Sequence, residues 1–204
     1  MNKKFAFTLS EVLVTMSIIG VISALTVPTL INSYQRKAYS VQLRKVVNDI
    51  SNAVDMLITE EGKTKFSATT EYANLDTFVT RRFKTIKTCS KDETNQCFAS
   101  ENYVSIDGKY NGAFECEGNS YVLANSAAIC IYKKTSLYNG WPVVVTDING
   151  QEGPNIGGRD MFTFVISPNG EIIGTSHEND CTRDHFGDGC YDLLAEENNW
   201  QMNY

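Results

Sequence analysis

The clearest feature of the hydropathy pattern is an uncharged run near the N-terminus. The twenty residues from Val12 to Ile31 contain no charged side chain, and they follow Lys3, Lys4 and Glu11. At a rise of about 1.5 Å per residue, such a run forms a helix roughly 30 Å long, which matches the hydrocarbon core of a bilayer. The run therefore predicts a membrane-spanning helix.

A second helical pattern follows directly and extends to about residue 58. Apolar side chains recur at three- and four-residue steps, and polar or charged side chains occupy the opposite face. The apolar positions are Tyr39, Leu43, Val46, Val47, Ile50, Val54, Leu57 and Ile58. Because only Pro28 interrupts the sequence between the two patterns, they predict one long helix, with a kink or local melting at residues 20 to 28. The apolar stripe of the second half needs a partner surface.

In the rest of the chain, the predicted secondary structure changes from helices to β-strands. Residues 63 to 70 are small and polar, which predicts a loop, and residues 72 to 86 show a weaker helical pattern. Beyond Cys89, short β-rich runs alternate with turn dipeptides, and the clearest hairpin turns at Ser167-Pro168-Asn169-Gly170. The expected strands are 103–106, 121–123, 128–132, 142–146 and 161–167, with a return strand at 171–173. We therefore expect an α+β fold, in which the long helix packs on an antiparallel sheet of about four strands.

Charge and cysteine content refine this picture. The chain has 204 residues, enough for one domain and an anchor, and its net charge of −6 gives no overall basic field that would attract nucleic acid. All six cysteines lie beyond residue 88, which indicates an oxidising compartment and a disulfide-rich head. The lysines before the apolar run place the N-terminus in the cytoplasm by the positive-inside tendency, so that the head lies outside.

The six cysteines pair most simply between near neighbours along the chain. Those pairs are Cys89 with Cys97, Cys116 with Cys130, and Cys181 with Cys190. Six cysteines allow many other pairings, which the sequence leaves open. In each case the role is structural, because a short closed loop restricts the unfolded chain.

The N-terminal stretch resembles the leader and first helix of type IV pilins and of type II secretion pseudopilins. In that family a short basic leader is removed on the cytoplasmic side, which here implies a cut between Ala6 and Phe7 and methylation of the new amine of Phe7. Glu11 then becomes the fifth residue of the mature chain, as in the family, and Gly20 and Pro28 fall at mature positions 14 and 22. One position departs from the family pattern, because Ala6 stands where glycine is usual.

The resemblance gives Glu11 a role in assembly. A carboxylate next to lipid costs roughly 2.5 kcal/mol or more unless it gains a partner, and the free amine of Phe7 in an adjacent copy is such a partner. A buried ion pair of this kind also fixes the stagger between helices, because a slipped register would strand both charges. The implied organisation is a leader at residues 1–6, a membrane and filament-core helix at 7–33, and an extracytoplasmic pilin-like domain at 34–204.

These observations favour a structural subunit, a minor pilin or pseudopilin, of a type IV pilus-like or type II secretion filament. The implied partners are other pilin or pseudopilin subunits, the prepilin peptidase and an inner-membrane assembly platform. The chain would cross the inner membrane once, with its N-terminus in the cytoplasm, and then enter a periplasmic or extracellular filament. The alternative is an uncleaved, membrane-anchored binding domain, in which Glu11 is incidental.

Other candidate chemistry is sparse. The sequence lacks the motifs of serine hydrolases, P-loop proteins and zinc proteases, so we expect no enzyme activity. His177, Cys181, His185 and Cys190 have a spacing that could hold zinc, but an oxidising exterior favours a disulfide. Oxygen ligands suited to calcium occur in two loops, as Asp147, Asn149 and Asp160, and as Asp180, Asp184 and Asp188. We expect no metal or other cofactor, with calcium in one of these loops as the alternative to turn chemistry.

Overall fold

The computed structural model describes residues 8–134, 138–175, 181–182 and 186–204. The chain divides into two compact units, Met1–Ala38 and Tyr39–Tyr204, and each is described by itself. The first unit contributes only helix to the described residues, whereas the second contains the sheet, the disulfides and the hydrophobic core.

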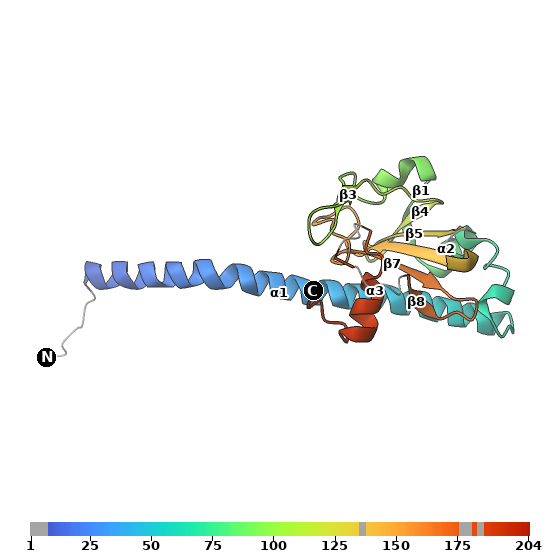
Figure 1. Cartoon of the computed structure of the whole chain (residues 1–204), viewed down its shortest axis with the longest axis horizontal. Helices are drawn as coiled ribbons and strands as arrows, with labels where there is room; N and C mark the ends of the chain where they lie inside the picture. Colours follow the sequence, from blue (N-terminus) through green and yellow to red (C-terminus); the bar gives the residue numbers. More distant parts are fainter. Residues whose placement is uncertain (1–7, 135–137, 176–180, 183–185) are drawn as a thin grey trace. The chain divides into compact units, whose positions relative to one another are not determined.

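Helix α1 extends from Leu9 to Glu60, as the two helical patterns predicted (Figure 1). It is unbroken at Gly20 and Pro28, so the local melting expected there is not found. Proline removes one backbone donor, but the turns on either side keep their own hydrogen bonds, and the helix continues. The expected stripe is buried in the second unit, where Leu43, Val54 and Leu57 are fully enclosed.

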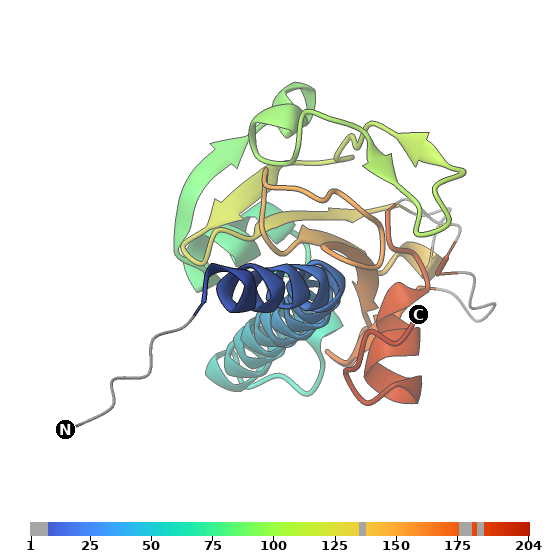
Figure 2. The same cartoon turned by 90° about the vertical axis from the view of Figure 1, so that its left-hand side faces the viewer.

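The second unit is built on an antiparallel sheet of six strands rather than about four. The strand order is β1-β4-β5-β6-β7-β8, and every neighbouring pair is antiparallel (Figure 2). The expected hairpin joins β7 to β8, and Ser167 N–H donates to Glu171 O at 2.8 Å to close its turn. The strands are Thr85–Cys89 (β1), Ser120–Leu123 (β4), Ala128–Lys133 (β5), Pro142–Asp147 (β6), Met161–Ile166 (β7) and Ile172–Gly174 (β8).

The helix predicted at residues 72 to 86 is only partly confirmed. Helix α2 covers Leu75–Arg82, and Asn74 begins it by accepting a hydrogen bond from Thr77 N–H at 3.1 Å. The segment that follows pairs with β4 instead, so Ile86 lies in strand β1. The remaining elements are Phe66–Ala68 (η1), Lys91–Gln96 (η2), Tyr103–Val104 (β2), Asn111–Gly112 (β3), Tyr138–Gly140 (η3), Cys190–Asp192 (α3) and the π-helical turn Leu193–Glu197 (η4).

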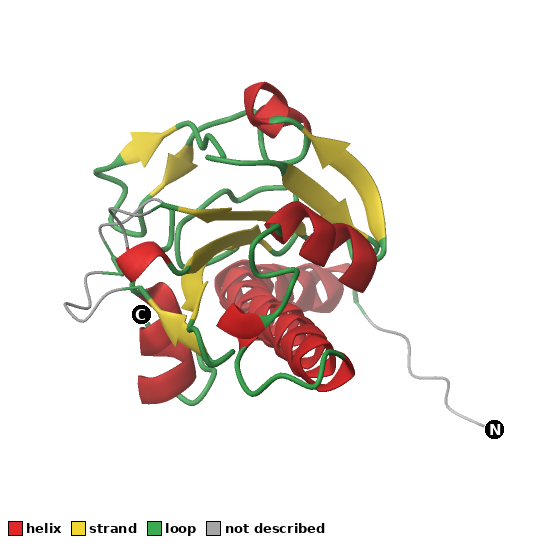
Figure 3. Ribbon diagram, turned by 90° about the vertical axis from the view of Figure 1, so that its right-hand side faces the viewer, coloured by secondary structure: helices red, strands yellow, loops and turns green. Residues whose placement is uncertain are grey.

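Both faces of the sheet are covered. The stripe of α1 packs on one face against Tyr121, Ile131 and Phe164, and the segment between residues 89 and 116 covers the other. Figure 3 shows the sheet lying between α1 and the layer that carries β2 and β3. Because both faces are buried, every residue of β6 and β7 is enclosed, and these strands are nearly continuously apolar instead of alternating.

Three disulfides brace this unit in the near-neighbour pairing that the sequence favoured. Cys89 bonds Cys97, Cys116 bonds Cys130 and Cys181 bonds Cys190, with Cα atoms 6.1, 5.9 and 4.6 Å apart. Cys130 lies in β5 and Cys116 in the covering segment, so that bond fastens the second layer to the sheet. The head is therefore disulfide-rich, as expected of a chain outside the cytoplasm.

Candidate assembly site on the N-terminal helix

The start of α1 is a capping box formed by Thr8 and Glu11. The Glu11 carboxylate accepts hydrogen bonds from the backbone N–H of Thr8 at 2.8 Å and from its hydroxyl at 2.7 Å. In return, Glu11 N–H donates to Thr8 Oγ1 at 3.3 Å. This reciprocal pattern satisfies backbone donors that a helix start otherwise leaves unpaired. Glu11 thus has hydrogen-bond partners within its own chain.

Sequence reasoning missed this local role, although a signal was present. Threonine followed three residues later by glutamate, just before an apolar run, is the pattern of a capping box. The charge of Glu11 next to the apolar run pointed only to a membrane boundary, whereas its carboxylate also bonds to Thr8. The scissile bond between Ala6 and Phe7 lies outside the described residues.

The helix surface that follows Glu11 is apolar and unburied. The large side chains from Val12 to Ile31 are all exposed, from 41% for Val12 to 73% for Leu25. Within the described residues, α1 is the one helix whose length and hydropathy would suit a membrane crossing, and none of its most apolar window is buried. Signal sequences and buried core helices can meet the same length and hydropathy test, but a core helix would not leave this surface open.

Most hydroxyl side chains of this stretch bond within the helix. Four hydroxyls donate to backbone carbonyls three or four residues earlier, at 2.8 to 3.4 Å. They belong to Thr15, Ser17, Thr26 and Thr29. Internal bonding of this kind suits an apolar surrounding, where an unpaired polar group costs several kcal/mol, on the order of 2 to 7. The surface can therefore be covered by lipid or by other apolar helices.

Comparison with known proteins gives the same interpretation. Residues 1–27 match the family model of the prokaryotic N-terminal methylation motif. The chain carries a prepilin-type signal. This signal is the signature of type IV pilins and pseudopilins, which confirms the resemblance, and it fits an anchor in the inner membrane. Neither a curated protein nor a solved structure matches the chain.

Two of the residues considered for calcium are buried and close to one another, Asp147 at the end of β6 and Asp160 in the loop that leads to β7. Asp147 Oδ2 accepts a hydrogen bond from the hydroxyl of Tyr103 at 2.6 Å, and Asp160 accepts from the N–H groups of Asn155 and Ile156, both at 2.7 Å. Burial raises the pKa of Asp147 to about 8, and the charge of Asp160 adds to the shift. Burial also raises the pKa of Asp160, to about 6.

Both carboxylates bond to donors of the protein, and these hydrogen bonds hold the ends of the loop together. Two amide oxygens nearby in the sequence, Asn149 Oδ1 and Asn155 Oδ1, are buried without a hydrogen-bond partner. The arrangement offers oxygen ligands of the type that calcium takes. The Asp and Asn side chains of this loop also supply hydrogen bonds that its irregular backbone lacks.

The second group of candidate ligands is described only in part. His177, Asp180, Asp184 and His185 lie outside the described residues. Cys181 and Cys190 bond to each other, so neither offers a thiolate to zinc. The carboxylate of Asp188 accepts hydrogen bonds from the hydroxyl of Tyr138 at 3.2 and 3.3 Å.

Proposed function

We propose that this chain is a structural subunit of a pilin-like filament, a minor pilin or pseudopilin, rather than an enzyme. The methylation motif at residues 1–27 is the observation that carries the proposal. The exposed apolar surface of α1 supports it, because such a surface needs lipid before assembly and the helices of neighbouring subunits afterwards. The disulfide-braced head would form the outside of the filament.

In this proposal, cleavage after Ala6 creates the charge that assembly needs. The freed amine of Phe7 is a cation at neutral pH, and it pairs with the Glu11 carboxylate of an adjacent copy. A carboxylate accepts several hydrogen bonds, so Glu11 can keep its bonds to Thr8 while it accepts one from the neighbour. The capping box would thus hold the acceptor in place before the partner arrives.

The direct test is the mass of the mature N-terminus. The full chain is expressed with and without a prepilin peptidase and recovered from the membrane for intact-mass measurement. We expect the peptidase to remove the six residues Met1–Ala6 and the new N-terminus to carry one methyl group. The sample without peptidase is the control and should keep its leader. A chain that retains the leader in both samples would contradict the filament proposal and support a membrane-anchored binding domain.

Sheared surface fibres test the second half of the proposal. We expect the mature chain in the fibre fraction of its native cell, separate from the membrane pool. Complete processing without any fibre-associated chain would mean that the signal is used but that the product does not polymerise.

A further inference from the structure

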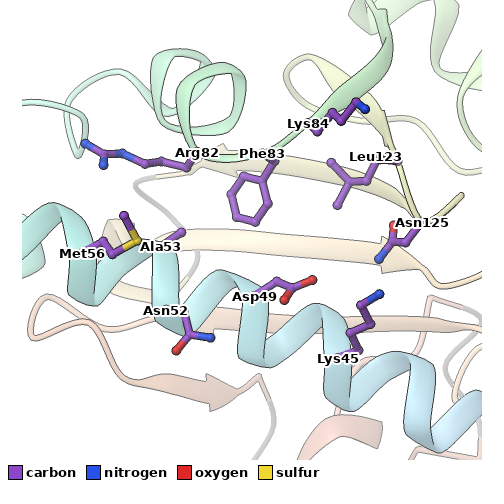
Figure 4. Close-up of a pocket in the computed structure, with 11 residues that line it drawn as sticks. Lys45, Asp49, Asn52, Ala53, Met56, Arg82, Phe83, Lys84, Leu123 and Asn125 are labelled. Carbon is purple, nitrogen blue, oxygen red and sulfur yellow. The ribbon is translucent and has the colours of Figure 1, made fainter.

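A groove of about 450 Å³ opens along the head between the second half of α1, the segment that leads into β1, and the end of β4 (Figure 4). Its apolar part is formed by Ala53, Phe83 and Leu123, and Met56, which is 56% exposed, lies at its rim. The groove therefore combines a hydrophobic floor with an open side. The other lining residues are Lys45, Asp49, Asn52, Arg82, Lys84, Ala124 and Asn125.

The charged side chains of the groove are largely unpaired. Among the described residues, Lys45, Asp49 and Lys84 form no ion pair and no side-chain hydrogen bond. Arg82 differs, because it binds the buried carboxylate of Glu71 at 3.0 Å. Lys45 comes from the helix wall and Lys84 from the opposite wall, so the two free cations flank the apolar floor (Figure 4). This pattern suits an acidic partner.

The charge of the head is strongly segregated along the sequence. Residues 39–91 contain nine Lys or Arg and six Asp or Glu. Residues 92–204 contain five Lys or Arg and seventeen Asp or Glu. The first segment is thus net +3 and the second net −12, within a chain of net −6. The groove is made mainly by the first segment, and its lining has three basic side chains against one acid, Asp49, so it is a basic site on an acidic domain.

The groove and the α3–η4 segment lie at opposite edges of the sheet. Strand β1, which follows Lys84, forms one edge, and β8 forms the other, where α3 packs against it. Figure 2 shows β1 and the α3–η4 segment on opposite sides of the head. Glu196 in η4 is exposed and has no ion pair or side-chain hydrogen bond in the described structure. The acidic edge thus offers a free carboxylate away from the groove.

We propose that the groove binds the acidic α3–η4 edge of a second copy of this chain, with Glu196 placed against Lys84. This inference rests on the proposed filament function and names a contact between heads within it. The two patches differ and lie on opposite edges, so the contact is heterologous and leaves a free groove and a free acidic edge at the ends. Contacts of that type continue from copy to copy, as a filament requires.

A charge exchange tests the contact in the full-length chain in its native cell. We expect Lys84→Glu alone and Glu196→Lys alone each to lower the yield of sheared fibres about fivefold or more, because each places like charges together. The double variant restores the attraction with its direction reversed, and its yield should return to within about twofold of the original. A residue that only supports folding would not be rescued in this way.

Lys65→Glu is the matched control, because it makes the same charge change at an exposed residue outside the groove. Its fibre yield should equal that of the original chain. Leader removal and the three disulfides are followed in every variant, so that loss of processing or folding is recognised.

The outcomes separate the two proposals. If the original chain forms fibres but Lys84→Glu is without effect, or the double variant is as poor as either single variant, the groove contact is overturned and the filament function stands. If the original chain is neither cleaved nor found in fibres, the filament function fails, and the contact between copies fails with it.

Discussion

Replacing Glu11 with glutamine separates two roles that a single side chain holds. Glutamine keeps an acceptor oxygen where the carboxylate accepts the N–H and hydroxyl of Thr8, at 2.8 and 2.7 Å, and capping boxes use either residue. The substitution therefore preserves the start of the helix while it removes the charge. Alanine at the same position removes both.

The magnitudes of the two roles differ enough to be distinguished. Loss of a helix cap costs about 1 kcal/mol, whereas leaving one member of a buried ion pair without its partner costs about 3 to 5 kcal/mol. Each 1.4 kcal/mol is about a tenfold change in an equilibrium constant, so the unpaired amine of Phe7 should weaken each helix contact about a hundredfold or more. We thus expect Glu11→Gln and Glu11→Ala to impair assembly almost equally.

The assay compares fibre yield with leader removal in the same cells. Leader removal should stay close to that of the original chain for both variants, while fibres are lost. Thr8→Val serves as the control, because it removes both hydroxyl bonds of the capping box but retains the bond from Thr8 N–H and the charge of Glu11. It should assemble nearly normally. Normal fibres from Glu11→Gln would refute the charge-pairing argument and leave the capping box as the role of Glu11.

Three further predictions concern the stability of the head, measured by thermal or denaturant unfolding of the full chain in detergent. The buried Asp147, with its pKa raised to about 8, holds a proton in the folded state that an unfolded aspartate has lost above about pH 4. Its contribution to the free energy of unfolding is thus greatest at low pH and falls by on the order of 2 to 4 kcal/mol from pH 5 to pH 8. Asp147→Asn should reduce this dependence of the unfolding free energy on pH. An unchanged dependence would contradict the raised pKa of Asp147. Replacing both Cys116 and Cys130 with serine should lower the free energy of unfolding by about 3 kcal/mol. The disulfide has a sequence separation of 14, so it closes a short loop in the unfolded chain and limits its conformations. A decrease under about 1 kcal/mol would contradict this expectation. Leu57→Ala should lower the free energy of unfolding by about 2 to 5 kcal/mol, because the Leu57 side chain is fully buried against the sheet. Met56 at the preceding position is exposed, so Met56→Ala should lower it by under about 1 kcal/mol.

Local patterns predicted the elements that depend on neighbouring residues. The spacing of Leu43, Ile50 and Leu57 identified the buried stripe of α1, because a helix places residues three and four apart on one face. The hairpin at Ser167 to Gly170 was predicted for a similar reason, since its turn residues favour the backbone that the turn needs. The short cysteine spacings gave the simplest pairing, and that pairing is the one in the structure.

Of the candidate sites, one was predictable from a local pattern and the others were not. The prepilin-type signal is a linear motif and was recognisable from the residues before the cut, the acid after it and the apolar run. The groove between α1 and the segment before β1 was not predictable, because Lys45 and Lys84 are far apart in the sequence and meet only through packing. The burial of Asp147 was also not predictable, since an Asp two residues before Asn-Gly is typical of an exposed turn.

The sequence by itself determined the prepilin-type signal, the long helix with its apolar first half, and the cysteine pairs that form the disulfides. Each of these follows from hydropathy, charge or spacing within a short stretch of chain. Only the tertiary structure decided that the sheet has six strands with both faces covered, that α2 stops at Arg82, and that Lys45 and Lys84 line one groove. Those features depend on which distant segments pair and pack, and that choice is made by the burial of the whole domain rather than by any local pattern.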